Sequence, residues 1–226
     1  MKTTTALLDG PRLGPRAGET PRRLVVLLHG VGADGNDLIA LAPYFRALMP
    51  DALVVAPNAP EPFDMAPFGF QWFSIRDLEA APRLDGVRRA APILDGFLDA
   101  ELARLRLAED RLILCGFSQG AMMALHVGLR RTKPVEALIS HSGMLIGAEH
   151  LEAEIRSRPP VLLTHGAADD VVPAQSLPAA KAALEVAGVS VRTQLVPGLG
   201  HGIDETTVRA ALGFVGELVG ARGLQH

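Results

Sequence analysis

A serine lies between two glycines in the segment Gly116-Phe117-Ser118-Gln119-Gly120. An apolar run, Leu112 to Cys115, comes before this segment, and a stretch with helical spacing follows it. The pattern predicts a sharp turn from a strand into a helix, which would hold Ser118 in a strained conformation and expose its hydroxyl at the carboxyl end of a sheet. Ser118 is therefore a candidate nucleophile for acyl transfer. The alternative is a glycine-rich turn in which the serine only caps the helix.

A serine nucleophile needs a base, and the base needs an acid that orients it. In hydrolases built around such a turn, the acid and then the histidine follow the serine along the chain. His201 lies in a glycine-rich turn between the last predicted strand and the final predicted helix. Because an imidazole can take up and return a proton near neutral pH, we predict His201 as the base. The alternative is a histidine that only satisfies the turn.

Two adjacent aspartates, Asp169 and Asp170, follow the predicted strand Val161 to Thr164, where the orienting acid is expected. Either residue can serve on spacing alone. Asp170 can instead cap a helix that begins near Pro173, because an acid just before a first-turn proline is a common helix start. This consideration favours Asp169 as the acid, and a family resemblance supports the same residue.

Acyl transfer also needs hydrogen-bond donors where negative charge develops on the carbonyl oxygen. The amide of Gln119, the residue after the nucleophile, is one candidate donor. The second is expected in the loop after the first long strand, His29 to Gly35, and we place it on Val31. The glycines of this loop do not match a dinucleotide-binding turn, and the chain has no Gly-Lys-Ser/Thr element, so the sequence does not indicate a nucleotide site.

The other reactive side chains have simpler explanations. None of the seven histidines has metal-ligand spacing, and we expect neither a metal nor a cofactor. His141 ends a predicted strand, where it either lines the pocket or packs with its hydrogen bonds satisfied. The only cysteine, Cys115, excludes an intrachain disulfide and is expected to be a small buried residue in a reducing compartment.

Strands and helices alternate along the chain, and they must position these side chains. The predicted strands are Leu24 to Leu28, Ala52 to Ala56, Arg111 to Cys115, Ala137 to Ser140, Val161 to Thr164 and Ser190 to Val196. The predicted helices are a long one whose apolar face runs from Val87 to Leu105, then Gln119 to Arg130, Ala174 to Ala187 and Thr206 to Val219. The alternation predicts an α/β fold, an open and mostly parallel sheet with helices on both faces. Ligands of such sheets bind outside the carboxyl ends of the strands.

Residues 57–85 interrupt this alternation. The segment contains prolines and five clustered aromatic residues, namely Phe63, Phe68, Phe70, Trp72 and Phe73. Loops of this length are uncommon in compact domains unless they serve a function, so we predict a substrate-covering loop. The alternative is a satellite apolar cluster without a role in substrate binding.

Composition limits the class of protein. With 226 residues, 48% of them hydrophobic, the chain can bury one substantial core, and we expect a single domain, 1–226, with residues 1–23 as an N-terminal extension. A net charge of -3 without long charged blocks does not favour nucleic acid as a partner. The sequence shows neither a secretory signal nor an apolar stretch of about 20 residues. We expect a cytoplasmic protein without stable membrane insertion, and we name a homodimer as a candidate assembly.

Several separate segments together resemble the carboxylesterase, phospholipase and acyl-protein thioesterase family of alpha/beta hydrolases, particularly its bacterial members. The likeness spans about Leu24 to Val219. The matching segments are Leu28 to Leu38 for the oxyanion loop, Ala56 to Pro60 for the next strand end, Gln71 to Phe73 for a tryptophan segment near the acyl site, Gly116 to Gly120 for the serine turn, His165 to Pro173 for the acid loop and Gly200-His201 for the base.

The resemblance implies Ser118, Asp169 and His201 as a catalytic triad, with Val31 and Gln119 as oxyanion donors, in agreement with the spacing. It also implies hydrolysis of carboxylic esters with short or medium acyl chains, and some members cleave thioesters or lysophospholipids. The expected partner is therefore a small-molecule or acyl ester substrate. The predicted substrate-binding residues are Trp72, Phe73 and Val172.

Two other classes of function are alternatives to the enzyme. A noncatalytic binding module would keep the pocket without turnover, and a lipid-surface protein would anchor through the aromatic segment. The order of serine, acid and histidine along the chain favours the enzyme.

Overall fold

The centre of the protein is a seven-stranded sheet. The computed structural model describes residues 8–15, 17–77 and 79–223. The strands of the sheet are β1 (Arg12–Leu13), β2 (Arg23–Leu28), β3 (Ala52–Val55), β6 (Leu112–Phe117), β7 (Ala137–His141), β8 (Val161–Gly166) and β9 (Val191–Val196). Their order is β1-β3-β2-β6-β7-β8-β9. All neighbours are parallel except β1, which runs antiparallel to β3. The predicted mostly parallel α/β sheet is confirmed.

The central strands are apolar along their whole length because helices cover both faces of the sheet. In β2, Leu24, Val26 and Leu28 pack into one apolar cluster, while Val25 and Leu27 pack into the other. This alternation is the one expected of successive side chains on a strand. The sheet therefore separates two cores.

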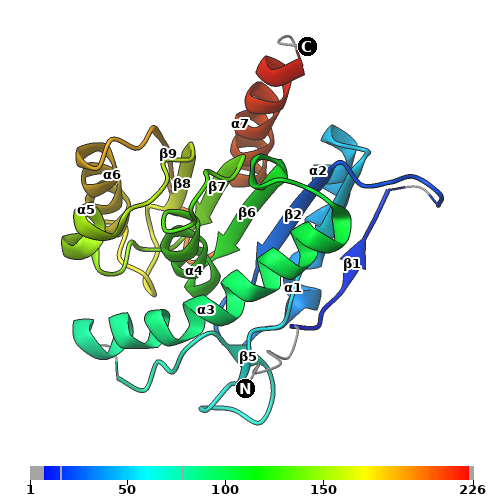
Figure 1. Ribbon diagram of the computed structural model, residues 1–226. Coiled ribbons are helices and arrows are strands. Elements are labelled where there is room, and N and C mark those ends of the chain that lie inside the picture. Colours follow the sequence, from blue (N-terminus) through cyan, green and yellow to red (C-terminus); the bar gives the residue numbers. More distant parts are fainter. Residues whose placement is uncertain (1–7, 16, 78, 224–226) are drawn as a thin grey trace.

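The helices form one layer on each face of the sheet (Figure 1). One core is closed by α3 (Ala80–Leu105), α4 (Gln119–Gly128), α5 (Leu151–Glu154) and α6 (Ser176–Val186). The other is closed by α1 (Gly35–Ile39), α2 (Ala42–Leu48) and α7 (Glu205–Gly223). The described residues also form two short 3-10 helices, η1 (Glu109–Arg111) and η2 (Ala148–His150).

The segment predicted as a loop over 57–85 needs a correction at its end. Helix α3 begins at Ala80, because Leu84 lies one turn before Val87 and extends the same buried face. Pro82 falls in the first turn, where its missing N–H has no helical partner in any case. The segment also contains a two-stranded sheet formed by β4 (Glu61–Pro62) and β5 (Phe70–Gln71). The irregular part of the segment is accordingly shorter than predicted.

The N-terminal extension predicted over 1–23 is partly built into the sheet. Arg12 and Leu13 of β1 pair with Val55 and Val54 at the edge of β3. Two residues are too few to produce a recognisable period, so no strand could be predicted there. Residues 1–7 lie outside the described part of the chain.

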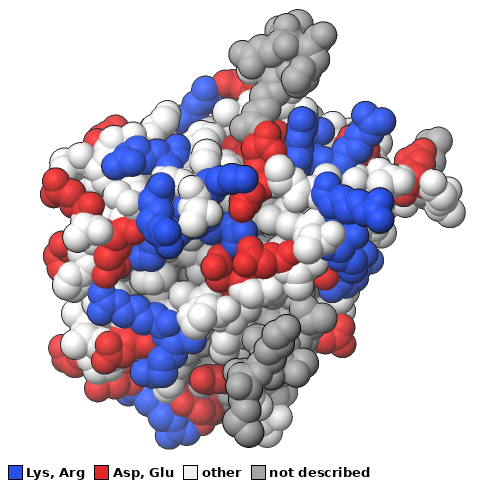
Figure 2. All heavy atoms as spheres, in the orientation of Figure 1, with Lys and Arg blue, Asp and Glu red and all other residues white. Residues whose placement is uncertain are grey.

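The surface is charged without a dominant sign on the face shown in Figure 2, where lysine and arginine side chains alternate with aspartate and glutamate side chains. Within the described residues, no helix is long and apolar enough to span a bilayer.

Gly120, in the first turn of α4, packs directly against the backbone of β2, and we predict that its replacement is costly. A Cβ atom at this position would overlap the carbonyl oxygen of Leu28. Gly120→Ala should therefore lower the free energy of unfolding by about 1–3 kcal/mol, measured by chemical denaturation. Gly213→Ala is the matched control, because a Cβ there meets no atom within 4 Å on an exposed position of α7. That control should gain about 0.5–1 kcal/mol from helix propensity. Equal stability of Gly120→Ala and the wild type would contradict the close approach.

Candidate active site

Ser118 occupies the sharp turn between β6 and α4. Its backbone has φ 52° and ψ -118°, a conformation that L residues rarely adopt. The amide of Ser118 donates to the carbonyl of His141 at the end of β7, with an N···O distance of 2.9 Å. Its side chain makes no capping hydrogen bond to α4. The turn therefore presents a serine whose hydroxyl is not used to cap the helix.

The two flanking glycines explain why the chain can make this turn. A Cβ atom on Gly116 would overlap the backbone of Gly120. Strand β6 can approach the first turn of α4 this closely only if Gly116 lacks a side chain, and Gly120 must lack one because a Cβ there would overlap the backbone at the end of β2. The strain at Ser118 is thus maintained by packing on either side of it.

Asp169 is held by hydrogen bonds on both carboxylate oxygens. Oδ1 accepts from the amides of Val171 and Val172 at 2.9 and 2.8 Å, and Oδ2 lies 2.8 Å from Nδ1 of His201. The carboxylate is fully buried, whereas the His201 side chain keeps 15% of its surface exposed. The structure thus brings together the predicted acid and the predicted base.

Burial raises the pKa of the Asp169 carboxyl, but its hydrogen bonds act in the opposite direction. The bonds from His201 and from the amides of Val172 and Val171 outweigh the cost of burial, so the pKa lies below its ordinary value. Asp169 is therefore ionised near neutral pH. Its neighbour Asp170 is exposed, and it does not cap α6, which begins at Ser176 after Gln175.

His165 is a contact of Asp169 that the sequence did not reveal. Its side chain is 1% exposed, and Nε2 lies 2.9 Å from the carbonyl oxygen of Val172 and 3.2 Å from Oδ2 of Asp169. Both neighbours are acceptors, so Nε2 carries the proton. A second imidazole thus contacts the carboxylate oxygen that His201 contacts. The available signal was the spacing of His165 four residues before Asp169 in the loop after β8.

Ser118 and His201 lie at the same end of the sheet without a hydrogen bond between them in the described part of the chain. The ring of Phe117, the residue before the serine, is 4.9 Å from the ring of His201, measured between centroids. Hydrogen bonds of catalytic groups are often long before substrate binds.

Val31 and Gln119 both line a cavity of about 360 Å³ next to Ser118, which we call the elbow cavity. Gln119 is the first residue of α4, and amides at a helix N-terminus have no partner within the helix. Among the described residues, neither amide donates a hydrogen bond within the protein. Two N–H groups are therefore available at the wall beside the serine.

The elbow cavity is lined mainly by apolar side chains. Phe73 and Val172, two of the predicted substrate-binding residues, belong to this lining. Met122 of α4 and Met144 extend it, and Ser74 and Ile75 follow Phe73 along the same wall. Such a lining suits a hydrocarbon chain.

The prediction of Trp72 as a substrate-binding residue is corrected by its position. The side chain is 1% exposed and does not line the elbow cavity. Its indole N–H donates to the carbonyl oxygen of His29 at 3.0 Å. A buried tryptophan with its N–H satisfied supports the loop after β2 from beneath, instead of contacting a substrate.

The side chain of Gln119 connects the serine turn to the tryptophan segment. Its Oε1 accepts from the amide of Trp72 at 2.8 Å, and its Nε2 donates to the carbonyl of Phe73 at 2.7 Å. The residue is 2% exposed, so both bonds are protected from water. The sequence predicted only the backbone role of Gln119, because nothing in the pattern indicates where its side chain bonds.

His29 fixes the loop that carries Val31. Its Nε2 accepts from the amide of Ala59 at 2.9 Å, so Nδ1 carries the proton and donates to the carbonyl of Gly30 at 2.7 Å. Burial lowers the pKa of His29, against the raising effect of the Gly30 carbonyl. The amide of Gly32 donates to Phe70 at 2.8 Å, which ties the same loop to β5.

The chain is similar over most of its length to known proteins. The model of the phospholipase/carboxylesterase family matches residues 16–218. The chain is 30% identical over 191 residues to esterase YpfH of Escherichia coli K12, covering 84% of this chain and 81% of that protein.

The chain belongs to the phospholipase/carboxylesterase family.

Two further proteins are similar to the chain over most of their length. Acyl-protein thioesterase 1 of Schizosaccharomyces pombe is 30% identical over 180 residues, covering 75% of this chain and 77% of that protein. The crystal structure of esterase PE8 is 45% identical and superimposes with a TM-score of 0.90, covering 93% of this chain and 99% of that one. The chain is accordingly a hydrolase of the carboxylesterase and thioesterase type with the alpha/beta hydrolase fold.

Two other histidines of this carboxylesterase-family chain are buried away from the acid. His141 at the end of β7 lies 2.7 Å from Oγ1 of Thr164 through Nδ1, and it does not line the elbow cavity. His126 on α4 has no hydrogen-bond partner for Nδ1 among the described residues. Burial lowers the pKa of each to about 4, and for His126 the Arg130 charge adds to the effect. In the described part of the chain, no group of three or more His, Cys, Asp or Glu side chains is placed to hold a metal ion.

The lowered pKa values predict a loss of stability on mild acidification. Between about pH 6.5 and pH 4 the unfolded chain binds protons on His126 and His141 that the folded protein does not bind, so the free energy of unfolding falls as the pH falls. His126→Gln removes one of these groups and should reduce the loss between pH 7 and pH 5 by up to about 2 kcal/mol. Denaturation curves at pH 7 and pH 5 measure the difference. An unchanged pH dependence in the variant would show that His126 does not resist protonation.

Proposed function

We propose that the chain is a serine esterase that works through an acyl-enzyme, with Ser118 as nucleophile, His201 as base and Asp169 as the orienting acid. The hydrogen bond between His201 Nδ1 and the doubly anchored Asp169 carboxylate carries the proposal. It leaves Nε2 of His201 as the nitrogen that exchanges a proton with Ser118. Ser118 lies at the same end of the sheet, one residue from the ring that packs on His201.

The first half-reaction forms the acyl-enzyme. Ser118 Oγ bonds to the ester carbonyl carbon while its proton passes to Nε2 of His201. The tetrahedral intermediate then collapses, the bond from carbon to the leaving oxygen breaks, and that oxygen takes the proton from His201. The ionised carboxylate of Asp169 stabilises the imidazolium that exists in between, without accepting its proton.

The second half-reaction repeats these steps with water. His201 removes a proton from a water molecule, whose oxygen bonds to the acyl carbon, and the proton returns to Ser118 Oγ as the acid departs. In both halves, negative charge on the carbonyl oxygen is met by the amides of Val31 and Gln119. Each such donor is typically worth about 3–4 kcal/mol of barrier.

The substrates we propose are esters with short or medium acyl chains, bound with the chain in the elbow cavity. Its volume of about 360 Å³ and its lining of Phe73, Met122, Met144 and Val172 support this choice. Thioesters are a further candidate class, since one of the relatives is an acyl-protein thioesterase. Phe73, Ser74 and Ile75 belong to the segment predicted to cover the substrate, so we propose that this stretch forms the covering wall.

We further propose that the chain works as one domain in the cytoplasm. Its two cores share a single sheet, and its only cysteine is buried in β6. Burial raises the pKa of Cys115 to about 12, which makes it a packing residue.

Replacing Ser118 tests the nucleophile. Ser118→Ala should reduce the hydrolysis of a small nitrophenyl ester to background and abolish labelling by a fluorophosphonate, because no other hydroxyl in this position can form the acyl-enzyme. The unfolding transition should be retained, which separates lost chemistry from lost fold. Turnover in a folded Ser118→Ala protein would reject the assignment, and wild-type protein that resists the fluorophosphonate would favour a noncatalytic binding module.

Comparing the two adjacent aspartates tests the acid. Asp169→Asn should lower kcat by about 10³-fold or more, because an amide cannot hold the imidazole in the required tautomer. Asp170→Asn removes the same charge from an exposed neighbour and should retain activity within about threefold. Steady-state kinetics on one ester gives both values. Comparable losses in the two variants would contradict the assignment of Asp169.

A further inference from the structure

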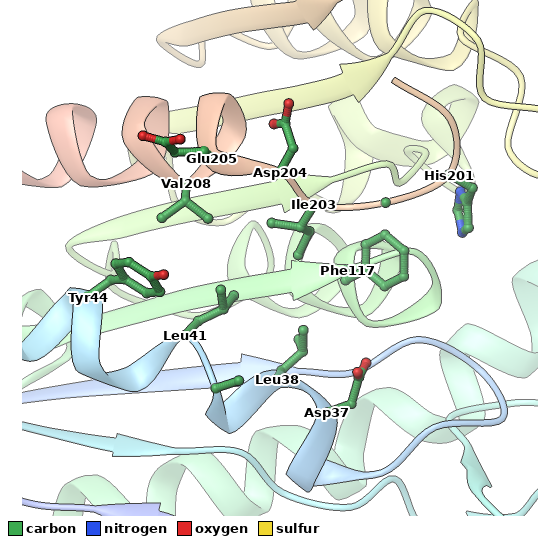
Figure 3. A pocket seen from close by; sticks show the side chains of 12 residues that line it. Asp37, Leu38, Leu41, Tyr44, Phe117, His201, Ile203, Asp204, Glu205 and Val208 are labelled. Carbon is green, nitrogen blue, oxygen red and sulfur yellow. The ribbon is translucent and has the colours of Figure 1, made fainter. Parts of the chain in front are cut away.

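A second cavity begins at His201 and extends away from the elbow cavity. It has a volume of about 780 Å³ and lies between α1 and α2 on one side and the start of α7 on the other, so we call it the α1–α7 cavity (Figure 3). Ser118 lines the elbow cavity but not this one, whereas His201 lines this one but not the elbow cavity. The serine turn supplies neighbouring residues to the two spaces, Phe117 to the α1–α7 cavity and Ser118 to the elbow cavity.

The proposed reaction dictates which part of an ester belongs in each cavity. The acyl carbon must be bonded to Ser118, with its oxygen at the amides of Val31 and Gln119, and these three residues line the elbow cavity. The leaving oxygen must receive its proton from His201. The group attached to that oxygen must therefore continue past His201, and the α1–α7 cavity is the space that begins there.

The walls of the α1–α7 cavity are apolar near His201. Leu38 and Leu41 come from α1 and the turn after it, and Ile203 faces them from the loop before α7. Phe117 lies between these residues and His201, with its ring against the imidazole. In Figure 3 the four side chains point into the same space. A leaving group with a hydrocarbon or aromatic body can bury its surface there.

The charged groups of this cavity are all acidic. The Asp37 carboxylate points from α1 toward Phe117 in Figure 3, and Asp204 and Glu205 lie on the opposite wall. Among the described residues, no lysine or arginine pairs with Asp37 or Asp204, whereas Glu205 pairs with Arg209. No lysine or arginine belongs to the lining. The cavity thus combines apolar walls with two carboxylates, Asp37 and Asp204, that no lysine or arginine of the described residues neutralises.

Asp204 immediately precedes α7, and a hydrogen bond from the first turn of that helix stabilises its charged form. Its Oδ1 accepts from the amide of Thr207 at 2.8 Å, and this bond lowers the pKa of its carboxyl. Its carboxylate points away from the cavity in Figure 3, so it acts at longer range than Asp37. Asp37 is therefore the residue whose replacement should change the field most.

We propose that the α1–α7 cavity binds the leaving group of the ester and selects alcohols or thiols that combine an apolar body with a positive charge over those that carry a negative charge. This inference rests on the proposed function, because it uses His201 as the proton donor to the leaving oxygen. It concerns the opposite end of the substrate from the acyl chain.

Three aryl butyrates test the charge preference. Their phenols carry a quaternary ammonium, a tert-butyl group or a sulfonate at the end of a saturated spacer, which keeps the acidity and the size of the three phenols similar. All three give the same butyryl-enzyme, so the second half-reaction is common to them and differences in kcat/KM arise in the first. We expect kcat/KM for the ammonium ester to exceed that for the sulfonate by about tenfold at low ionic strength, with the neutral ester between them. Raising the salt concentration should reduce the ratio.

Asp37→Asn should reduce the ammonium-to-sulfonate ratio by about threefold or more. Glu149→Gln is the matched control, since it removes one negative charge from an exposed side chain of η2, on the other layer of the protein. The control should keep the wild-type ratio. A ratio of one in the wild type, or a ratio that responds equally to both variants, would overturn the proposal.

Filling the cavity tests the location without using charge. Ala40 is an exposed lining residue at the end of α1, so Ala40→Trp places bulk in the α1–α7 cavity. It should lower kcat/KM for the tert-butylphenyl ester relative to the methyl ester of the same acid by about tenfold. Val171→Trp, at the exposed rim of the elbow cavity, should instead change the preference for acyl length. The inference would be overturned if Ala40→Trp changed the preference for acyl length and Val171→Trp changed the preference for the alcohol. That result would place the leaving group in the elbow cavity.

The proposed function is checked separately by fluorophosphonate labelling of Ser118. Wild-type protein that labels but shows no charge preference rejects the α1–α7 cavity as the leaving-group site and leaves the esterase assignment intact. Protein that neither labels nor turns over any of the three esters rejects both.

Discussion

One buried carboxylate determines the geometry of the site. Asp169 receives hydrogen bonds from the amides of Val171 and Val172 on one oxygen and from His201 on the other, where His165 also contacts it. These three hydrogen bonds act on both oxygens and leave the carboxylate a single orientation, with the His165 imidazole packed beside Oδ2. The cost of burying the charge is offset by the same contacts. A carboxylate that cannot rotate also fixes the plane of the His201 ring.

A second set of buried bonds fixes the opposite wall. Gln119 holds the backbone of Trp72 and Phe73, and Trp72 in turn holds the carbonyl of His29. The loop that carries Val31 is therefore connected to the serine turn through side chains that never reach the substrate. This arrangement keeps the two amide donors in place before any ester binds, which is how such donors are most effective.

The parts of the fold that the sequence predicted are those with long patterns. Apolar runs such as Leu24 to Leu28 can be recognised because both faces of the strand are buried, and the serine turn can be recognised because its glycines have no substitute. Strand β1 has only two residues, which is too short for a pattern of alternating side chains. Pro82 in the first turn of α3 is typical of a loop, so the start of that helix is not recognised from the sequence. Trp72 and His165 show a second limit of prediction from sequence. The residue type shows that a ring N–H needs a hydrogen-bond acceptor, but the acceptor comes from a distant or folded-back segment that only the structure identifies.

Placing the departing alcohol on the α1–α7 side of the imidazole has a kinetic corollary. The first product then diffuses out through an opening of its own while the acyl group stays on the serine, and the water of the second half-reaction enters by the route just vacated. Any other nucleophile must use that entrance as well. The ratio of hydrolysis to transfer of the acyl group to a second alcohol would then depend on the residues of α1 and α7. It would not depend on the residues of the elbow cavity that bind the acyl chain.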